Sequence, residues 1–210
     1  IRDAALQLRM VQIGDTFTRF NRVVRDVSKE LGKEIELLIN GAETELDKTV
    51  VEKIGDPLMH LVRNSLDHGI EATALRLERG KPACGRVMLN AFHDSGSIVI
   101  QVSDDGGGLN RAKIRAKAIE RELISPDSTL SDNEIVNLIF EPGFSTVDKV
   151  SKLSGRGVGM DVVRRNIQSL RGTVDVTSVE GEGSTFTIRL PLTLAIIDGF
   201  QVSIGKVSYV

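Results

Sequence analysis

The chain carries His60-Leu61-Val62-Arg63-Asn64-Ser65-Leu66-Asp67-His68-Gly69, and three shorter segments follow it in order. They are Asp104-Asp105-Gly106-Gly107-Gly108, Phe140-Glu141-Pro142-Gly143-Phe144 and Gly155-Arg156-Gly157-Val158-Gly159-Met160. Each segment places polar or aromatic side chains beside glycine, which lets the backbone approach a ligand closely. None is specific alone, but their order along one chain predicts a single binding site.

The first segment is predicted to lie on a helix that Pro57 begins and that ends before Gly69. One face of this helix is apolar and would pack in the core: Leu58, Leu61, Val62 and Leu66. His60, Asn64 and His68 recur at i, i+4 and i+8 on another face, where they would point into a cleft. An asparagine carbonyl oxygen suits Mg²⁺, which takes its other ligands from phosphates and water. The alternatives are a surface helix with incidental histidines and a zinc site, which is disfavoured because no third protein ligand is apparent.

Asp104 ends an alternating, strand-like run, and a glycine-rich turn follows it. A buried carboxylate at this place would accept a hydrogen bond from the amino group of adenine, and Gly106 and Gly108 would let the backbone approach the flat base. An isolated Asp-Gly pair is otherwise typical of a solvated turn. Lys113 and Lys117 lie one helical turn apart and would face the phosphates, although two lysines on an exposed helix need no ligand.

The fourth segment contains three glycines and leads directly into a predicted helix at 160–170. Backbone N–H groups at a helix N-terminus bind anions such as phosphate. The glycine spacing does not fit a Rossmann turn, and no P-loop motif occurs in the sequence. We therefore expect a different mode of nucleotide binding, in which residues 140–156 close over the phosphates and Phe140 and Phe144 anchor the closing segment. An ordinary surface loop is the alternative.

Helices and antiparallel hairpins are mixed along the chain, with few β-α-β units. Further helices are expected at 17–31, at 111–123 and after the capping pattern of Ser131 and Glu134. Strands are expected at 35–40, 86–92, 97–103, 173–179 and 184–190, the last four as two hairpins. This pattern predicts an α/β (α+β) two-layer sandwich, in which a mixed, largely antiparallel sheet carries helices on one face.

The composition indicates a globular protein without a large charge imbalance. The 210 residues have a formal net charge of −2, which gives no electrostatic argument for a nucleic-acid partner. No apolar run is long enough for direct membrane insertion. The one cysteine, Cys84, excludes an internal disulfide and, with no signal peptide visible, favours a cytoplasmic setting. The chain begins at Ile1 rather than Met, so we expect it to be a piece of a longer protein.

The four segments resemble the N, G1, F and G2 boxes of the Bergerat-type ATP-binding fold of histidine kinases, which Hsp90, gyrase B and MutL share. Residues 60–71, 140–146 and 191–196 look specifically like the CheA family of chemotaxis histidine kinases, and residues 181–184 resemble a further box of the fold. The resemblance implies three regions along the chain. They are the end of a dimerisation helix at 1–14, the ATP-binding catalytic domain at 15–191 and the start of a CheW-like regulatory domain at 192–210.

The same resemblance implies roles for individual residues, with ATP and Mg²⁺ as the cofactors. Asn64 would bind the Mg²⁺ of ATP with His68 nearby, and His60, Arg63 and Asn64 would form the catalytic group. Asp104 would hold adenine. The implied ATP-binding set is Asp104, Gly106, Gly108, Lys113, Lys117, Phe144, Gly155, Arg156, Gly157, Gly159, Met160 and Ser184.

His60 bears on the type of reaction. The branches of this superfamily that hydrolyse ATP, and many sensor kinases, carry a glutamate four residues before the metal-binding asparagine, where it can activate water. A histidine at that place favours transfer of the γ-phosphoryl group to a histidine on a separate phosphoacceptor domain of the full-length protein. The resemblance further implies a CheW-type adaptor, chemoreceptors and a downstream response regulator as partners. An ATP-hydrolysing clamp and a non-catalytic nucleotide-sensing module are the alternatives.

Overall fold

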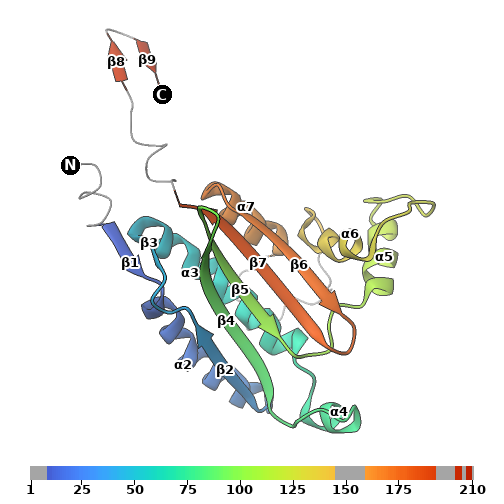
Figure 1. Cartoon of the computed structure of the whole chain (residues 1–210). Helices are drawn as coiled ribbons and strands as arrows, with labels where there is room; N and C mark the ends of the chain where they lie inside the picture. Colours follow the sequence, from blue (N-terminus) through green and yellow to red (C-terminus); the bar gives the residue numbers. More distant parts are fainter. Residues whose placement is uncertain (1–8, 145–158, 193–201, 205–206, 210) are drawn as a thin grey trace.

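A five-stranded sheet with helices against one face forms the body of the structure (Figure 1). This computed structural model describes residues 9–144, 159–192, 202–204 and 207–209. Its helical elements are α2 (Gly14–Leu31), α3 (Lys48–Asn64), η1 (Ser65–Gly69), α4 (Thr73–Glu78), α5 (Arg111–Glu120), α6 (Asp132–Asn137), η2 (Leu138–Phe140) and α7 (Met160–Ser169). Its strands are β1 (Met10–Gln12), β2 (Ile35–Asn40), β3 (Glu45–Asp47), β4 (Gly85–Asp94), β5 (Ser97–Asp104), β6 (Thr173–Val179), β7 (Gly183–Pro191), β8 (Val202–Ile204) and β9 (Val207–Tyr209).

The main sheet is mixed and largely antiparallel, as expected. Its strand order is β2-β4-β5-β7-β6; β2 and β4 run parallel and the other neighbours run antiparallel. Both predicted hairpins form, as β4–β5 and as β6–β7. The first has a two-residue turn in which Ser95 and Gly96 take φ angles of 49° and 79°. Such left-handed turn residues match the natural twist of the two strands, which explains the choice of glycine.

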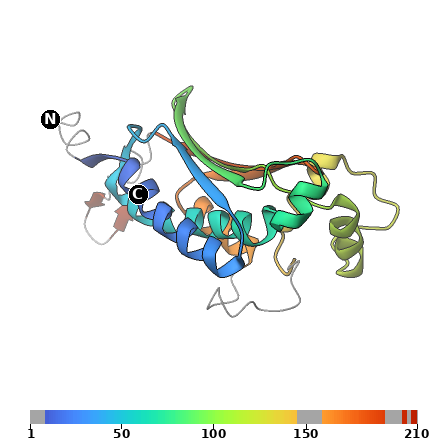
Figure 2. The ribbon, with the colours of Figure 1, turned by 90° about the horizontal axis from the view of Figure 1, so that it is seen from below.

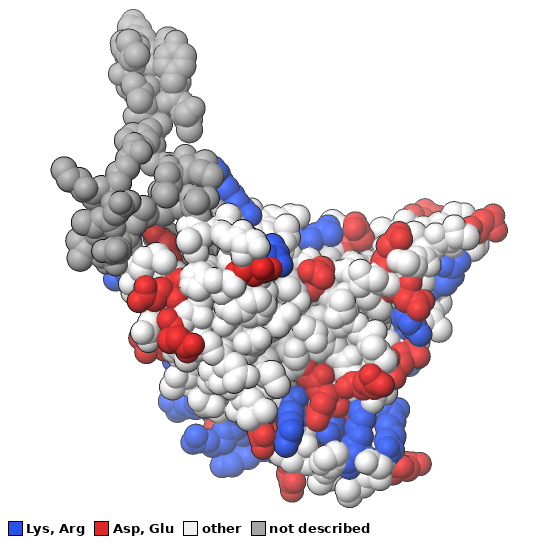
Figure 3. Space-filling view, in the orientation of Figure 1, with Lys and Arg blue, Asp and Glu red and all other residues white. Residues whose placement is uncertain are grey.

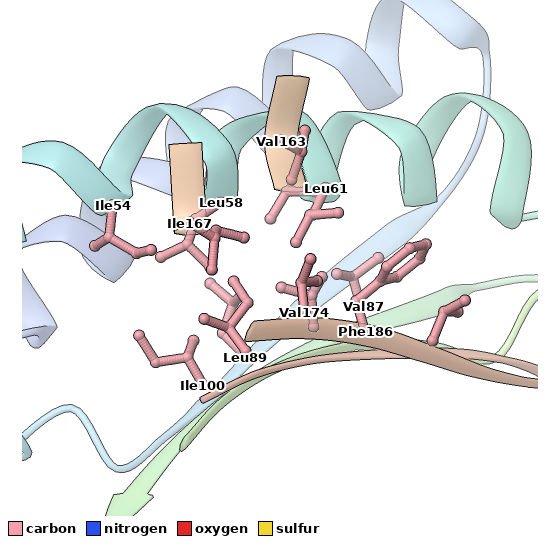
Figure 4. Packing of buried hydrophobic residues seen from close by; sticks show 14 of the residues in the cluster. Ile54, Leu58, Leu61, Val87, Leu89, Ile100, Val163, Ile167, Val174 and Phe186 are labelled. Carbon is pink, nitrogen blue, oxygen red and sulfur yellow. The ribbon is translucent and has the colours of Figure 1, made fainter. Parts of the chain in front are cut away.

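The core lies between the sheet and three helices that cover a single face of it. Figure 2 shows α2, α3 and α7 on the same side of the sheet. Side chains of α3 and α7 point toward alternate residues of the strands in Figure 4. The four apolar residues predicted for one helix face lie on α3 and, for the last, on η1, and all are 0% exposed: Leu58, Leu61, Val62 and Leu66. The two-layer sandwich is therefore confirmed, and its core holds α3 in a fixed position against the sheet.

Helix α3 differs from the prediction at both of its ends. It begins at Lys48, where the Asp47 carboxylate accepts a hydrogen bond from Thr49 N at 2.8 Å, so the expected start at Pro57 is wrong. A proline inside a helix removes one backbone donor, but here its ring is buried on the face that packs in the core. At its other end the helix widens into η1, a π-helical turn closed by Ile70 N and Ser65 O at 2.8 Å. Single π-turns often occur at functional sites.

Strand β1 replaces part of the helix that the resemblance implies at the N-terminus. Met10–Gln12 pairs antiparallel with β3, and the next residue, Ile13, donates its N–H to Thr44 O at 2.9 Å. These backbone hydrogen bonds and the complete burial of Ile13 favour the strand over a continuing helix. Residues 1–8 lie outside the described part, and the proposed boundaries of the three regions stay a prediction.

The side chain of Asn137, the last residue of α6, covers the outer edge of the sheet. Its Nδ2 donates to Val176 O at 3.0 Å, and Val176 N donates to its Oδ1 at 3.0 Å. Val176 lies at the middle of β6, the edge strand. The amide thus forms the two hydrogen bonds that a neighbouring strand would form at this residue.

The uncovered face of the sheet carries little charge and mixes polar side chains with the exposed apolar Met88 and Phe92 of β4. Figure 3 shows few Lys, Arg, Asp or Glu side chains over its centre. Ser103 and Thr185 hydroxyls lie 3.0 Å apart on neighbouring strands, and Asn90 Nδ2 donates to Gln101 Oε1 at 3.4 Å. Among the described residues no helix is both long and apolar enough to cross a bilayer.

Gly41→Ala should destabilise the fold far more than Gly80→Ala. Both glycines take a left-handed φ, 77° and 74°, so the conformational cost of alanine is similar, about 1 kcal/mol. A Cβ on Gly41 would lie 1.8 Å from Ala91 O, whereas one on Gly80 would meet nothing within 4 Å. We expect an additional loss of about 2 kcal/mol or more in the free energy of unfolding for Gly41→Ala. Urea unfolding measures both variants, and equal midpoints would contradict the packing argument.

Candidate functional site

Asp104 and Ser184 meet at one end of the sheet. Asp104 ends β5, Ser184 is the second residue of β7, and the two are partners in the antiparallel register. Ser184 is 7% exposed, and its hydroxyl lies 2.9 Å from that of Ser178 on β6. The structure therefore brings together two residues that the sequence predicted for one site and that are far apart along the chain.

The Asp104 carboxylate is partly shielded from water. Burial raises its pKa, and this effect outweighs the stabilisation of the charged form by the Gly106 and Ser184 N–H groups and the Ser65 hydroxyl. Gly106 N donates to Asp104 Oδ1 at 3.0 Å. A carboxylate with few water contacts binds an incoming N–H donor strongly because water no longer competes for it. The arrangement suits recognition of an amino group on a flat base.

Glycines around Asp104 are required by the protein's own backbone. A Cβ on Gly106 would lie 1.9 Å from Gly69 O, and one on Gly69 would lie 3.0 Å from Asp104 Oδ2. Gly107 N donates to Gly69 O at 3.0 Å, which joins the end of η1 to the turn after β5. On the other side of the turn, a Cβ on Gly108 would lie 2.4 Å from Val179 O. The predicted reason for Gly106 and Gly108, approach to the base, is therefore incomplete, because both permit contacts between segments of the chain.

The adjacent carboxylate, Asp105, is held by different partners. Its Oδ1 accepts from Arg86 N at 2.8 Å, and its Oδ2 accepts from Arg76 Nη2 at 3.2 Å. Asp104 bonds within the turn itself, through Gly106 N. The two neighbouring carboxylates therefore differ in their partners: Asp105 is bonded to Arg76 and to the Arg86 backbone, whereas Asp104 is bonded within its own turn.

Helices α3 and α7 meet at Asn64. Its Nδ2 donates to Met160 Sδ at 3.1 Å, which joins the first and fourth segments. Burial, with a smaller contribution from the charge of Arg63, lowers the pKa of half-buried His60, so this imidazole is neutral at pH 7. His68 is exposed and lies 3.5 Å from Asp67 Oδ2. His68 lies on the π-helical turn η1 rather than on α3, so the α-helical spacing assumed for the three residues does not extend to it.

Lys33 closes the end of the π-helical turn. Its Nζ donates to Leu66 O at 3.0 Å, Asp67 O at 3.0 Å and Ile70 O at 2.7 Å. Burial lowers the pKa of this ammonium group, while the negative charges of Asp67 and Glu71 act in the opposite direction. One cation from the segment before β2 thus satisfies carbonyl groups that a π-turn leaves without helical partners.

The predicted phosphate-binding residues lie on α5, on the aromatic segment and at the start of α7. Lys113 is exposed, whereas Lys117 Nζ lies 5.9 Å from the centre of the Phe144 ring. Phe144 is 4% exposed, and Phe140 packs edge-on against Phe186 at 6.2 Å, so both aromatic anchors are buried as expected. Gly159 precedes the first turn of α7, while Gly155, Arg156 and Gly157 lie outside the described residues.

The residues present fit Mg²⁺ better than a metal held by protein alone. Within the described ranges, no group of three or more His, Cys, Asp or Glu residues could hold a metal ion. Asn64 offers one hard oxygen ligand, and its amide orientation is set by the N–H donated to Met160. A cation that brings phosphate and water ligands needs no more from the chain.

Two features of the site were not predicted from the sequence. The Ser65 hydroxyl is buried and has no partner of good hydrogen-bond geometry among the described residues, although it lowers the pKa of Asp104. A cluster of buried charges around Arg76 lies behind Asp105. Ser65 follows Asn64 directly in the sequence, and this position is a signal that could have identified it. The Lys and Arg residues at 76–81 give no such signal, because in the sequence they look like an ordinary solvated helix.

Comparison with known protein families gives one match over most of the chain. Residues 54–194 match the family described as histidine kinase-, DNA gyrase B-, and HSP90-like ATPase. The chain is 53% identical over its full length to a protein of Bacillus subtilis named Chemotaxis protein CheA, and 50% identical over 98% of its length to Sensor histidine kinase CheAY of Helicobacter pylori. It spans 31% and 26% of the lengths of these two relatives.

Two solved structures of histidine kinases share the fold of this chain. The catalytic domain of histidine kinase ThkA matches 87% of this chain and 94% of that structure, with a TM-score of 0.54 and 13% identity. The mycobacterial sensor histidine kinase MprB matches 87% of this chain and 95% of that structure, with a TM-score of 0.53 and 17% identity. At such low identity these matches concern the fold alone.

Gly183→Ala should disrupt the site, whereas Gly181→Ala should not. Both glycines of the β6–β7 turn have a positive φ, but a Cβ on Gly183 would lie 2.0 Å from Asp104 O and one on Gly181 would meet nothing within 4 Å. Displacing the Asp104 backbone should weaken adenosine binding at least about tenfold. Calorimetric titration of both variants tests this, and similar affinities would show that Asp104 does not bind the base.

Adenosine binding should weaken as pH falls through the raised pKa of Asp104. Only the ionised carboxylate accepts hydrogen bonds on both oxygens, so the ligand favours that form, and a raised pKa moves the loss to higher pH than for an ordinary aspartate. Adenosine is the appropriate probe because it has no phosphate to titrate. The control is Asp104→Asn, which should bind weakly and without this pH dependence; a pH-independent affinity of the unmodified protein would contradict the assignment.

Proposed function

Because the chain belongs to the family of histidine kinase-, DNA gyrase B- and HSP90-like ATPases, we propose that it is the ATP-binding catalytic domain of a chemotaxis histidine kinase. In this proposal it transfers the γ-phosphoryl group of Mg-ATP to a histidine on a separate phosphoacceptor domain. Identity of 53% over the whole chain to a CheA protein supports the chemotaxis assignment. The activity and partners of a complete kinase are part of the proposal, since the chain spans 31% of that relative.

The observation that carries the proposal is the half-buried Asp104 carboxylate at the end of β5. Burial raises its pKa, Gly106 N donates to it at 3.0 Å, and Ser184 lies beside it on the neighbouring strand. In this proposal Asp104 accepts a hydrogen bond from the adenine amino group, and Ser184 supports that contact. A site that pairs with a specific amino group discriminates strongly against bases that lack it.

The phosphates would lie toward α3, α5 and the start of α7. Asn64 would hold Mg²⁺ through its amide oxygen, with His68 near the metal and Lys113 and Lys117 toward the phosphates. Bound Mg²⁺ would neutralise the charge of the phosphates and orient them. Gly159 is the N-cap of α7 and Met160 is its first residue. The backbone N–H groups at this end of the helix favour binding of an anion.

His60 and Arg63 complete the proposed catalytic group. A lowered pKa keeps His60 neutral at pH 7, so it adds no positive charge of its own and can accept a hydrogen bond or a proton. Transfer to a histidine acceptor needs no activation of water, because a neutral imidazole is already a nucleophile. The same neutral His60 could take a proton from water, so ATP hydrolysis is the second candidate function.

The acceptor histidine is proposed to belong to another part of the full-length protein. The chain has three histidines, of which His60 and His68 belong to the site and His93 lies on β4 next to a hairpin turn. We further propose a cytoplasmic setting, with a CheW-type adaptor, chemoreceptors and a response regulator as partners. The relatives named CheA support this pathway.

Incubation with labelled ATP, with and without a phosphoacceptor domain of a CheA relative, tests the proposal. We expect label on the acceptor, none on this chain, and loss of transfer by at least about a hundredfold in Asn64→Ala because metal binding is lost. Steady phosphate release without acceptor would favour hydrolysis instead. Label on this chain, or full activity of Asn64→Ala, would contradict the proposed roles.

A further inference from the structure

A buried arginine lies directly behind the turn that carries Asp105 and Gly106. Arg76 on α4 has a side chain only 1% exposed, and α4 lies at the end of the sheet where β4 begins (Figure 1). All five of its N–H donors are engaged. Nε donates to Pro82 O at 2.8 Å, Nη1 to Glu71 Oε1 at 3.0 Å and Asp105 O at 3.1 Å, and Nη2 to Asp105 Oδ2 at 3.2 Å and Cys84 O at 3.5 Å.

Glu71 is the shared partner of three cations. Its Oε1 accepts from Arg76, and its Oε2 accepts from Arg79 Nη1 at 3.2 Å and Lys81 Nζ at 2.9 Å. Burial alone would raise the pKa of Glu71, but the Lys81 hydrogen bond and the surrounding positive charges lower it, so the carboxylate is ionised. Glu71 comes two residues after Gly69, and the cluster therefore begins where η1 ends.

Lys81 connects this cluster to the backbone of the turn after β5. Its Nζ donates to Asp105 O at 3.0 Å and to Gly106 O at 2.8 Å, in addition to Glu71. A trans peptide is planar, with its C=O and N–H pointing in opposite directions. The Asp105 carbonyl bonded to Lys81 belongs to the same peptide as Gly106 N–H, which donates to Asp104 Oδ1. The Gly106 carbonyl shares a peptide with Gly107 N–H, which donates to Gly69 O at 3.0 Å.

The Asp105–Gly106 and Gly106–Gly107 peptides are therefore each held at both the carbonyl and the N–H end. Cations hold the carbonyl ends, and Asp104 and Gly69 hold the N–H ends. A buried ion pair adds little stability relative to apolar residues of the same volume, but its hydrogen bonds fix the direction of the groups that it contacts. We propose that Lys81, with Arg76 and Glu71, is a positioning group that orients the Asp104 carboxylate before nucleotide binds. This inference rests on the proposed ATP-binding function.

Lys81→Met tests the role, because it keeps most of the side-chain stem and removes the donors to both carbonyls. Arg79→Met is the matched control: Arg79 also pairs with Glu71 but, among the described residues, forms no hydrogen bond to the turn, and its side chain is 44% exposed. Affinities for ADP and IDP are measured on the 210-residue chain. IDP lacks the amino group that Asp104 would bind, so the ADP-to-IDP ratio reports on the orientation of Asp104.

We expect Lys81→Met to weaken ADP binding about tenfold while changing IDP binding little, so that the preference for ADP falls. Arg79→Met should stay within about twofold of the unmodified chain for both nucleotides. Lys81→Arg, which keeps a cationic donor, should restore part of the preference. A purely structural role would lower both affinities together and leave the ratio unchanged.

Three outcomes separate the two proposals. If Lys81→Met keeps the full ADP preference, the positioning role is wrong while ATP binding stands. If the unmodified chain binds neither nucleotide, the proposed function fails and this inference fails with it. If circular dichroism shows that Lys81→Met does not fold, Lys81→Gln is measured in the same way, and an unchanged ratio in that variant overturns the role.

Discussion

Close contact between the backbone at Gly69 and the backbone at Gly106 is the constraint on which the site depends. There is no room for a Cβ on Gly106, which would lie 1.9 Å from Gly69 O. This contact brings the end of the helix that carries Asn64 against the strand end that carries Asp104. The metal-binding and base-binding sides of the proposed site therefore keep one fixed separation, because α3 is packed in the core and β5 is central in the sheet.

Local patterns predicted much of the fold. The strand at Ile35–Asn40, both hairpins and the buried face of α3 follow from alternation, turn residues and helical spacing. The start of α3 did not, because burial of the Pro57 ring outweighs the loss of one backbone donor. Strand β1 also escaped prediction, since its pairing with β3 depends on residues distant in sequence.

The sequence names candidate site residues one by one, but not how they are arranged, and their roles stay a prediction. Asp104, Ser184 and Asn64 were each named from short motifs, and the sheet register and the Asn64–Met160 contact bring these motifs together. The π-helical turn and the charges around Arg76 have no short-range signal, because both depend on carbonyl groups that the folded chain places near them. The motifs thus identify which chemical groups are present, and packing determines where each one points.

The amide of Asn137 has a consequence for association between copies of the protein. A free edge strand offers unpaired N–H and C=O groups, onto which a strand of another molecule can add and extend the sheet. At the middle of β6 these two groups are already occupied by one side chain from α6. Growth of the sheet past β6 would require α6 to separate from it, so this small contact opposes the addition of another strand at the middle of this edge.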